Sequence, residues 1–572
     1  MKKIGLLLVG IVSIFGVVGN ASAASMPNAI DGKITLSEDL QLTETFTVSE
    51  GEEITLDLAG HTITGSADID YYTIENNGNL TIIDTGETKG KIICLEDNSS
   101  CIINNNELTV DGVFATSLFA TIKNETTGNL IVKNSTIETT REGNSQTVGF
   151  TGALQNWGVA DVSNTTILAE NEYGVFVRSN DSVSSNTIIK DSNISADYAI
   201  YNEKLGSSTT RQNVTVSDTE ITGKISKLSG VDYTFSGNIK VHTNHNFVNN
   251  VILNASQEGT NVIIDVDFTS TLVIPDNVTV TIAEGKSLTV GSGGIKIGNG
   301  KLVVDGELKN ANVYLENTNA YYTTLRYAVN AVPLDSKDIN IKLLADTKDT
   351  SAISMSRKDI TIDLNGHTAT LPKYTVANNA VLTIKDSSEL GNGTIDGTVT
   401  NNGTLTIDGG KFLTLPTTGA DATTTITGGT FTSDVVEDLE IPENKEVIVN
   451  DDGTSSIVYK IADYTKVNEA IENAKAIDRS KYTEESLKAL DDVLNSLDMT
   501  LRLDKQDTVD AYVTLIEDAI NNLVEKTVTP VGPTEDIENP STGDNALTYV
   551  ILGGISLVGI AIASLYLKKK NN

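Results

Sequence analysis

A short strand-and-turn pattern, repeated from about Ile34 to Tyr459, constrains the fold of this chain more than any other feature. Apolar and polar residues alternate over short runs, and each run ends at Asn, Gly or Asp. Runs of this kind begin at Ile54, Leu80 and Leu108. Several short strands per repeat are typical of solenoid coils, because one coil buries its apolar residues only by stacking on the next. The pattern therefore predicts a mainly β solenoid.

A long-range duplication divides this region. Residues 54–64 read ITLDLAGHTIT, and residues 360–370 read ITIDLNGHTAT. Downstream of these strings, residues 72–84 read YTIENNGNLTIID and residues 374–386 read YTVANNAVLTIKD. A duplication of this length predicts two solenoid units in tandem.

These two strings resemble those of the right-handed parallel β-helix, or pectin-lyase-like fold, in bacterial surface proteins. The resemblance implies coils that pair in parallel around a core of Ile, Val and Leu. We expect a first unit at 24–319 and a second at 320–460, which opens with a short helix at Tyr322–Ala331 as its entry cap. Asparagines at the turns can stack as amide ladders. The candidates are Asn76, Asn77, Asn104, Asn105, Asn401 and Asn402.

The period of the pattern changes near Asp463, where apolar residues take helical spacing. Three amphipathic segments over 461–525 predict a small antiparallel three-helix bundle, with Thr483 and Asp504 as helix N-caps. The string YTEESLKALDDVL at 482–494 resembles the FIVAR module of cell-wall proteins, which implies a non-catalytic binding or spacer unit. Residues 526–538 contain prolines and acids, and they predict an extended linker.

The two ends of the chain are predicted to direct its export and attachment. Residues 1–23 have two lysines, a short apolar run and small residues up to Ala23, which is the pattern of a signal peptide cleaved after Ala23 or one residue later. Residues 547–567 form an uncharged apolar stretch that is long enough for a transmembrane segment, and residues 568–572 are a basic cytoplasmic tail.

The order of motif, apolar span and basic tail resembles the cell-wall sorting signal of Gram-positive surface proteins, whose usual motif is LPXTG. The motif here is NPSTG at 539–543, made of Asn539, Pro540, Ser541, Thr542 and Gly543. The resemblance implies that a sortase cleaves after Thr542 and joins its carbonyl to peptidoglycan. Asn539 stands where the usual motif has Leu, which leaves the sortase class open. The alternative is a single-span membrane protein with this string by chance.

Composition excludes some classes of function. The chain carries 76 acidic against 41 basic residues, a formal charge of -35, so its surface repels nucleic-acid phosphates. We expect no cofactor and no metal cluster, because the chain has only two cysteines and four histidines. Cys94 and Cys101 either form a local disulfide or remain two buried thiols in neighbouring coils.

No set of residues predicts a catalytic centre. His61 and His367 follow Gly at equivalent places in the duplicate, which favours a structural role in a turn. Asp265 and Asp267 are expected on one strand face, where they are either solvated or hold calcium. The few positive candidates for a catalytic base in the first unit are Arg141, Arg178 and Arg211.

Aromatic residues concentrate in neighbouring predicted coils. Trp157, Tyr173 and Phe176 are followed in the next coil by Tyr198 and Tyr201. They either pack in the core or stack against glycan rings on an outer face, with Trp157, Tyr173 and Tyr198 as the candidate ligand contacts. Together these observations predict a wall-anchored surface protein that binds glycans or host proteins. The alternatives are a surface polysaccharide lyase or glycosidase and a non-binding spacer.

Overall fold

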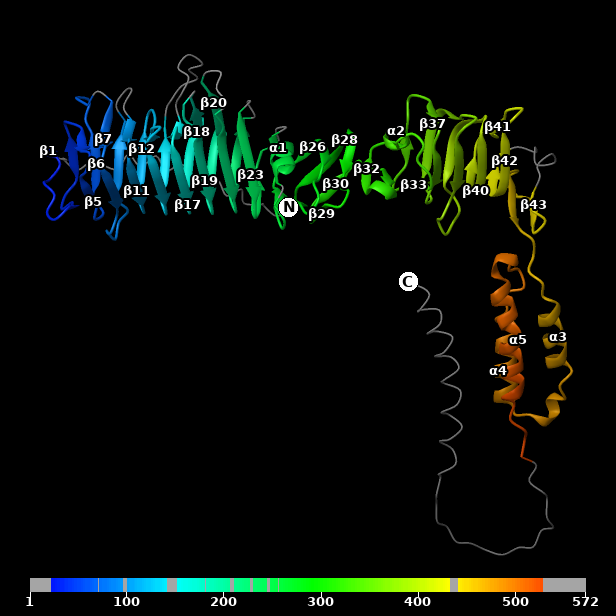
Figure 1. Cartoon of the computed structure of the whole chain (residues 1–572). Helices are drawn as coiled ribbons and strands as arrows, with labels where there is room; N and C mark the ends of the chain where they lie inside the picture. The colour runs from blue at the N-terminus through cyan, green and yellow to red at the C-terminus, as the bar shows by residue number, and fades with distance from the viewer. Residues whose placement is uncertain are drawn as a thin grey trace, which may run out of the picture. The chain divides into compact units, whose positions relative to one another are not determined.

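The computed structural model describes residues 22–69, 71–95, 100–140, 152–180, 182–205, 210–226, 230–243, 247–255, 257–432 and 441–527. The chain divides into two compact units between Lys460 and Ile461. The first unit is a stack of β coils that run along one axis (Figure 1). The second is helical, and each unit is described by itself.

The first unit is a parallel β-solenoid. One coil consists of β5 (Glu53–Asp57), β6 (Thr62–Gly65) and β7 (Tyr72–Asn76), and β8 (Asn79–Ile83) begins the next. β5 pairs in parallel with β8, and the same pairing continues through a nine-stranded sheet that takes one strand from each coil. The remaining strands, two in this coil and a single one in later coils such as that of β18 (Thr166–Ser179), belong to a second large sheet. The expectation of a mainly β, parallel solenoid is confirmed, whereas its handedness stays a prediction.

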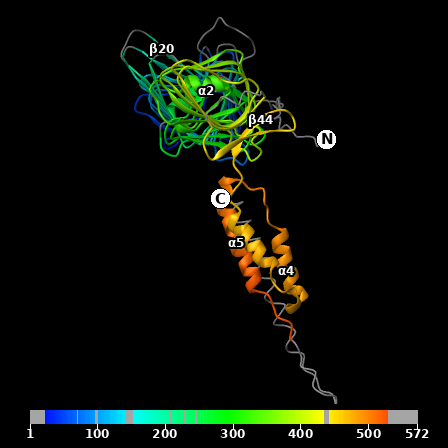
Figure 2. The ribbon, with the colours of Figure 1, turned by 90° about the vertical axis from the view of Figure 1, so that its right-hand side faces the viewer.

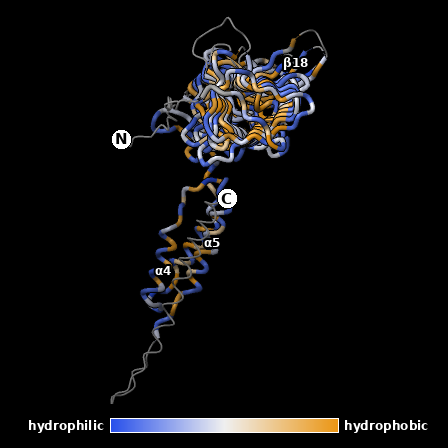
Figure 3. The backbone as a smooth tube through the Cα atoms, turned by 90° about the vertical axis from the view of Figure 1, so that its left-hand side faces the viewer, coloured by the Kyte–Doolittle hydropathy of each residue, from blue (hydrophilic) through white to orange (hydrophobic). Residues whose placement is uncertain are grey.

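Alternation along each strand separates the core from the surface. In β8, Leu80 and Ile82 are buried in the core, while Thr81 between them lies on the outer side. Orange and blue residues alternate around the coils in Figure 3 for the same reason. Because side chains point to opposite faces with a period of two, the pattern in the sequence decides which residues fill the interior.

An inner asparagine ladder connects successive coils. Asn76 donates its side-chain amide to Asn104 at 2.7 Å, Asn104 donates to Asn124 at 2.7 Å, and Asn124 donates to Asn156 at 2.8 Å. Asn156 then donates to the Thr187 hydroxyl at 2.8 Å. All of these side chains are fully buried, and their amides are satisfied by the ladder together with backbone carbonyls of neighbouring residues.

The predicted ladders are confirmed in the first unit and differ in the second. Asn77 and Asn105 form an outer ladder at 2.8 Å, parallel to the inner one. Asn401 donates instead to the Thr424 hydroxyl, because the next coil places a threonine at that level. Sequence reasoning did not include Asn124 and Asn156, although both stand at the ends of strands like the asparagines that it named.

One helix within the solenoid was not predicted. α1 (Phe247–Asn254) packs against β23 (Val231–Ser236), which is the last strand of the nine-stranded sheet. Its buried residues Val248, Val251 and Ile252 have helical spacing, a signal that was present in the sequence. The helix covers a sheet edge that would otherwise expose unpaired backbone groups.

Strand direction reverses at the predicted boundary near 319. β31 (Val313–Leu315) pairs in antiparallel fashion with both β32 (Ala320–Tyr322) and β33 (Ile339–Leu343), and parallel pairing resumes after β33. Two separate hydrophobic cores meet here: one ends at Ile297, and the next begins at Val313. The predicted short helix is α2 (Leu325–Ala331), which buries Leu325, Ala328 and Val329.

Three helices form the core of the second unit. α3 (Thr465–Lys475) and α4 (Glu484–Asn495) both pack against α5 (Gln506–Asn521). The Thr483 hydroxyl accepts a hydrogen bond from the Ser486 amide, as an N-cap does. The prediction that Asp504 caps the third helix was wrong, because Asp504 lies in a short 3-10 turn and the α-helix begins after Lys505.

Several predicted segments lie outside the described residues. These are most of the signal peptide, the NPSTG motif at 539–543, the span at 547–567 and the basic tail. Among the residues that are described, no helix has the length and hydropathy needed to cross a membrane. Ala23, the predicted cleavage point, lies within β1 (Ser22–Ala24), which pairs with β3 (Leu40–Leu42).

Candidate functional site

The candidate site lies on the outer side of three neighbouring strands of the first unit. β16 (Gly152–Asn156) pairs with β18 (Thr166–Ser179), and β18 pairs with β20 (Asn193–Lys204), where β18 and β20 are labelled in Figure 1. Val175 and Val177 point into the core, so Phe176 points outward between them. We call this surface the aromatic face. It consists of Trp157, Tyr173, Phe176, Arg178, Tyr198 and Tyr201.

The tyrosines of the aromatic face pack ring against ring. Tyr173 stacks on Tyr201 with centroids 4.2 Å apart and planes 2° apart. Tyr198 meets Tyr173 and Tyr201 edge-on, at 5.7 Å and 5.3 Å. Tyr198 stands directly opposite Tyr173 in the parallel pairing, so the cluster follows from the register of the two strands. These offset and edge-on geometries are the favourable ones for aromatic pairs.

Arg178 joins the rings to a carboxylate. Its guanidinium lies 4.4 Å from the centroid of the Trp157 ring and 4.9 Å from that of Phe176. Its Nε donates to Glu203 Oε2 at 2.7 Å, and Glu203 stands opposite Arg178 in β20. The residue is 9% exposed, so this charge is mostly desolvated and held by its ion pair and by the ring faces.

The three residues named as ligand contacts lie on this one face. Tyr173 and Tyr198 touch each other, and Trp157 connects to them through Arg178 and Phe176. Trp157, Tyr173 and Tyr198 are half-buried, whereas Phe176 is fully buried and serves packing. Sequence reasoning missed Glu203 as the partner of Arg178, because only the strand register brings the two side chains together.

The Tyr173 phenol is poorly suited to act as a general base at neutral pH. Burial raises the pKa of the Tyr173 phenol, and the neighbouring Tyr201 and Glu172 raise it further, to about 12. A general base works best when its pKa is close to the working pH, and Arg178 is held in an ion pair. The geometry therefore favours binding: ring faces, a cation and a carboxylate can hold a sugar by stacking and hydrogen bonds.

The two histidines of the duplicated motif occupy equivalent turns. The His61 amide donates to the Leu58 carbonyl, and the His367 amide donates to Leu364 in the same way. Each ring places Nδ1 near an aspartate of the preceding coil, at 3.5 Å from Asp39 for His61. His367 Nδ1 lies 3.7 Å from Asp346 Oδ1. Both histidines therefore lie in turns, and their purely structural role stays a prediction.

The interpretation of Asp265 and Asp267 as neighbours on a strand face was wrong. Both lie in the turn between β25 (Asn261–Ile264) and β26 (Phe268–Val273), because the first strand ends one residue earlier. Asp265 pairs with Lys240 at 3.0 Å, and Asp267 accepts hydrogen bonds from Ser287. Within the described ranges, no group of three His, Cys, Asp or Glu side chains is arranged to hold a metal ion.

The other residues singled out in the sequence are dispersed. A disulfide joins Cys94 to Cys101, with Cα atoms 5.5 Å apart, at the end of β9 (Lys91–Cys94) and the start of β10 (Ser100–Asn104). Arg211 forms a bidentate surface ion pair with Asp232. Arg141 lies outside the described residues.

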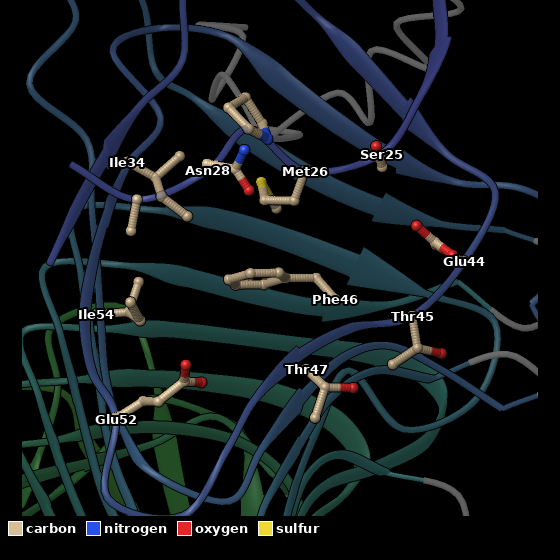
Figure 4. A pocket seen from close by; sticks show the side chains of 12 residues that line it. Ser25, Met26, Asn28, Ile34, Glu44, Thr45, Phe46, Thr47, Glu52 and Ile54 are labelled. Carbon is tan, nitrogen blue, oxygen red and sulfur yellow. The ribbon is translucent and has the colours of Figure 1, made fainter.

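A pocket lies at the first coil of the solenoid, away from the aromatic face. The ring of Phe46 projects into it, with Met26 opposite and Glu44 and Glu52 near its margin (Figure 4). Its volume is about 240 Å³. Met26, Phe46 and Ile54 also pack against the core, so this pocket is the incompletely covered end of the stack.

Comparison with solved structures gives a likeness in fold. One solved structure, a mutant of the PL6 family alginate lyase AlyGC, is similar over 68% of this chain and 71% of that chain, with a TM-score of 0.23 and 11% sequence identity. No protein-family model and no curated protein matches the chain.

Proposed function

We propose that this protein is an exported, wall-anchored surface protein whose β-solenoid binds glycans through the aromatic face. The single observation that carries the binding proposal is the gathering of Tyr173, Tyr198 and Tyr201 with Arg178 and Glu203 on one outer surface. Rings that are only half-buried are suited to stack on the apolar faces of sugar rings. The alternative of a non-binding spacer leaves this outward cluster without a role.

The attachment proposal rests on the sequence. The signal-peptide pattern at 1–23 supports export, and the NPSTG motif before the apolar stretch 547–567 supports transfer to peptidoglycan by a sortase. Pro540 restricts the backbone of the motif, and Gly543 leaves the bond after Thr542 unobstructed. The acyl group of Thr542 would then join an amine of the wall. The helical second unit, with its FIVAR-like string, and the linker at 526–538 would serve as the spacer between the solenoid and the wall.

A glycan and matrix-protein array probed with the purified full chain tests the binding proposal. We expect signals from glycans that are lost in the Tyr198→Ala variant and kept in Tyr314→Ala. Tyr314 is a matched control, since it is a half-buried tyrosine in β31 whose ring pairs with that of Tyr321, away from the aromatic face. Signals from proteins alone would contradict glycan binding and favour a protein ligand. No signal across a broad array would also contradict glycan binding and favour the spacer.

Attachment has its own test. Digestion of cell walls with a muramidase should release the protein covalently joined to wall fragments, and Thr542→Ala should abolish this linkage. Release of the wild-type chain by detergent alone would instead support a plain membrane protein.

A polysaccharide lyase is the second candidate, because the same aromatic face brings phenols and a cation beside Glu203. Incubation of the purified chain with uronic-acid polymers and calcium separates it from a binder. Appearance of unsaturated products, lost in Arg178→Ala, would favour the lyase.

A further inference from the structure

Glycine directly follows asparagine at five places in the chain, at 77–78, 299–300, 365–366, 392–393 and 402–403. An asparagine in this dipeptide is prone to deamidation, because glycine has no side chain to shield its backbone nitrogen. In that reaction the glycine nitrogen gives up its proton and bonds to the asparagine Cγ, the Cγ–Nδ2 bond breaks, and ammonia leaves. Water then opens the cyclic imide and yields aspartate or isoaspartate. All five dipeptides lie within the residues that the structure describes.

The glycine nitrogen is a hydrogen-bond donor in each of these dipeptides. The Gly78 amide donates to Asn76 Oδ1 at 3.2 Å, and the Gly403 amide donates to Asn401 Oδ1 at 2.9 Å. Both acceptor side chains are fully buried. The Gly300 amide donates at 2.9 Å to the backbone carbonyl three residues earlier. Buried asparagines and an ordinary turn therefore account for three of the five glycine amides.

One carboxylate accounts for the remaining two glycine amides. Asp386 directly follows β38 (Val381–Lys385). Its Oδ1 accepts from the Gly366 amide at 2.8 Å and from the Ser388 amide at 3.1 Å. Its Oδ2 accepts from the Gly393 amide at 2.6 Å. Because Gly366 and Gly393 lie in turns of neighbouring coils, a single side chain holds both of them.

Two of the asparagines that would react are held as well. Asn365 donates its side-chain amide at 3.0 Å to the Leu343 carbonyl of the preceding coil. Asn77 Oδ1 accepts from the Asn105 side chain at 2.8 Å. Cyclisation requires the asparagine Cγ and the glycine nitrogen to approach each other, with the nitrogen free to lose its proton. The hydrogen bonds of the fold must therefore open before the reaction can proceed.

We infer that the five asparagines are deamidation sites that the folded solenoid keeps unreactive, and that Asp386 is the group that protects Asn365 and Asn392. Opening of a coil frees the glycine nitrogen, and the reaction then replaces a neutral amide by a carboxylate. Asn392 Oδ1 lies beside Gly366, which binds Asp386, so a new charge there repels the carboxylate that holds the turn. The inference concerns the chemical durability of the chain and is independent of the proposed glycan binding.

The first unit provides a matched comparison within the same chain. Asp84 Oδ1 accepts from the Gly60 amide at 2.7 Å, and Asp84 Oδ2 accepts from the Gly90 amide at 2.5 Å. The residues before these glycines are Ala59 and Lys89, so the same arrangement encloses no reactive asparagine there. A substitution of Asp84 therefore disturbs an equivalent turn without exposing a deamidation site.

Peptide mapping by mass spectrometry tests this inference site by site, on the purified full chain incubated at mildly alkaline pH. In the folded wild type we expect all five asparagines to deamidate about tenfold more slowly than in the chain unfolded in urea, since each reaction must first break a hydrogen bond. Asp386→Ala should accelerate Asn365 and Asn392 together. Asp386→Asn should accelerate Asn392 alone, because its one side-chain oxygen stays with the two donors at Oδ1 and its amide cannot accept from Gly393.

Two controls separate this role from a general loosening of the fold. Asp84→Asn should leave all five deamidation rates unchanged. Asn299, whose glycine donates to a backbone carbonyl, should keep its wild-type rate in every folded variant. Circular dichroism melting checks that each variant folds. If Asp386→Ala does not fold, Asp386→Asn carries the test together with hydrogen exchange of the wild type, in which the Gly366 and Gly393 amides should exchange slowly.

The two parts of the inference fail separately. An unchanged rate at Asn392 in folded Asp386→Asn, or an equal acceleration of Asn299 and Asn392, would overturn the role of Asp386. A folded wild type that deamidates as fast as the unfolded chain would overturn the protection itself.

Discussion

Asp57 and Asp363 make the same two hydrogen bonds in the two copies of the duplicated motif. Asp57 Oδ1 accepts from the Ala59 amide two residues on and from the Thr85 amide of the next coil, both at 3.1 Å. Asp363 Oδ1 accepts from the Asn365 and Ser387 amides, both at 3.0 Å. The duplication therefore preserves a turn in which one buried carboxylate connects a coil to its neighbour.

A second carboxylate completes each turn. Asp84 Oδ1 accepts from the Gly60 amide at 2.7 Å, and Asp386 Oδ1 accepts from the Gly366 amide at 2.8 Å. Gly60 and Gly366 have φ of 85° and 82°, in the left-handed region that a residue without a Cβ adopts most easily. This explains why both copies keep the order Asp, Leu, a variable residue, Gly and His.

Replacement of Asp57 by Asn should make the solenoid less stable at neutral pH. Burial by itself raises the pKa of Asp57, but the hydrogen bonds from Thr85 and Ala59 and the nearby Lys33 outweigh burial and hold the pKa below its ordinary value. The stabilisation is therefore complete above about pH 4 and is lost as the pH falls through the lowered pKa. We expect Asp57→Asn to cost roughly 1–2 kcal/mol at pH 7 in urea unfolding.

The difference in free energy of unfolding between the wild type and Asp57→Asn should shrink towards zero in strong acid, because both side chains are neutral there. Asp421→Asn, at an exposed turn, is the matched control and should match the wild type throughout. A constant difference between Asp57→Asn and the wild type down to strongly acidic pH would show that the carboxylate charge is not what stabilises the turn.

The inner asparagine ladder should be more important for stability than the outer one. Asn104→Ala removes the acceptor of Asn76 and the donor to Asn124, and it leaves two fully buried amides without these partners. We expect a loss of roughly 2–4 kcal/mol, measured by thermal or urea unfolding followed by circular dichroism. Asn105→Ala, one residue further on in the half-buried outer ladder, should cost less than about 1 kcal/mol. Equal losses would contradict the role assigned to the buried ladder.

Reduction of the Cys94–Cys101 bond should have a modest effect. The two cysteines are separated by seven positions, so the bond closes a short loop and should stabilise the fold by about 2 kcal/mol. Mass spectrometry of the oxidised protein should show a gain of two hydrogens on reduction, with a small fall in melting temperature. The double variant Cys94→Ala, Cys101→Ala should melt like the reduced protein, and reductant should not change its melting temperature. Two free thiols in the protein isolated without reductant would refute the bond.

Tyr173 should ionise at an unusually high pH. Its pKa is raised to about 12 by burial first and then by Tyr201 and Glu172, whereas an unfolded tyrosine ionises near 10. An acid with a raised pKa stabilises the fold fully below the unfolded value, and this contribution is lost as the pH rises from about 10 to 12. Ultraviolet titration of wild type minus Tyr173→Phe should isolate a phenolate signal near pH 12. A signal near pH 10 would mean that Tyr173 is solvated and not packed in the aromatic face.

Local signals in the sequence predicted much of the fold because they act over short distances. Alternation in β8 decides that Leu80 and Ile82 face the core, and helical spacing predicts α2, α4 and the cap at Thr483. The same reasoning did not predict α1, although its buried residues have helical spacing in the sequence. It misplaced Asp265, because the end of a strand depends on pairing with its neighbours and not on its residues alone.

The candidate site was predicted only in part. Trp157, Tyr173 and Tyr198 were named from their density in the sequence, but their contacts with Arg178 and Glu203 could not be derived from it. The separation between stacked residues varies from coil to coil: 28 residues from Asn76 to Asn104, 20 from Asn104 to Asn124 and 32 from Asn124 to Asn156. A column of side chains therefore has no constant period.

The amino-acid sequence by itself determined that the chain coils into stacked β rungs and which side chains face inward, because both depend on alternation and turn residues within a few positions. Only the tertiary structure decided which outward side chains share a column, since loops of unequal length separate successive coils and backbone pairing alone sets their register. For that reason the contacts of Arg178 with Trp157 and Glu203 arise from the stacking of coils, although every one of these residues is visible in the sequence.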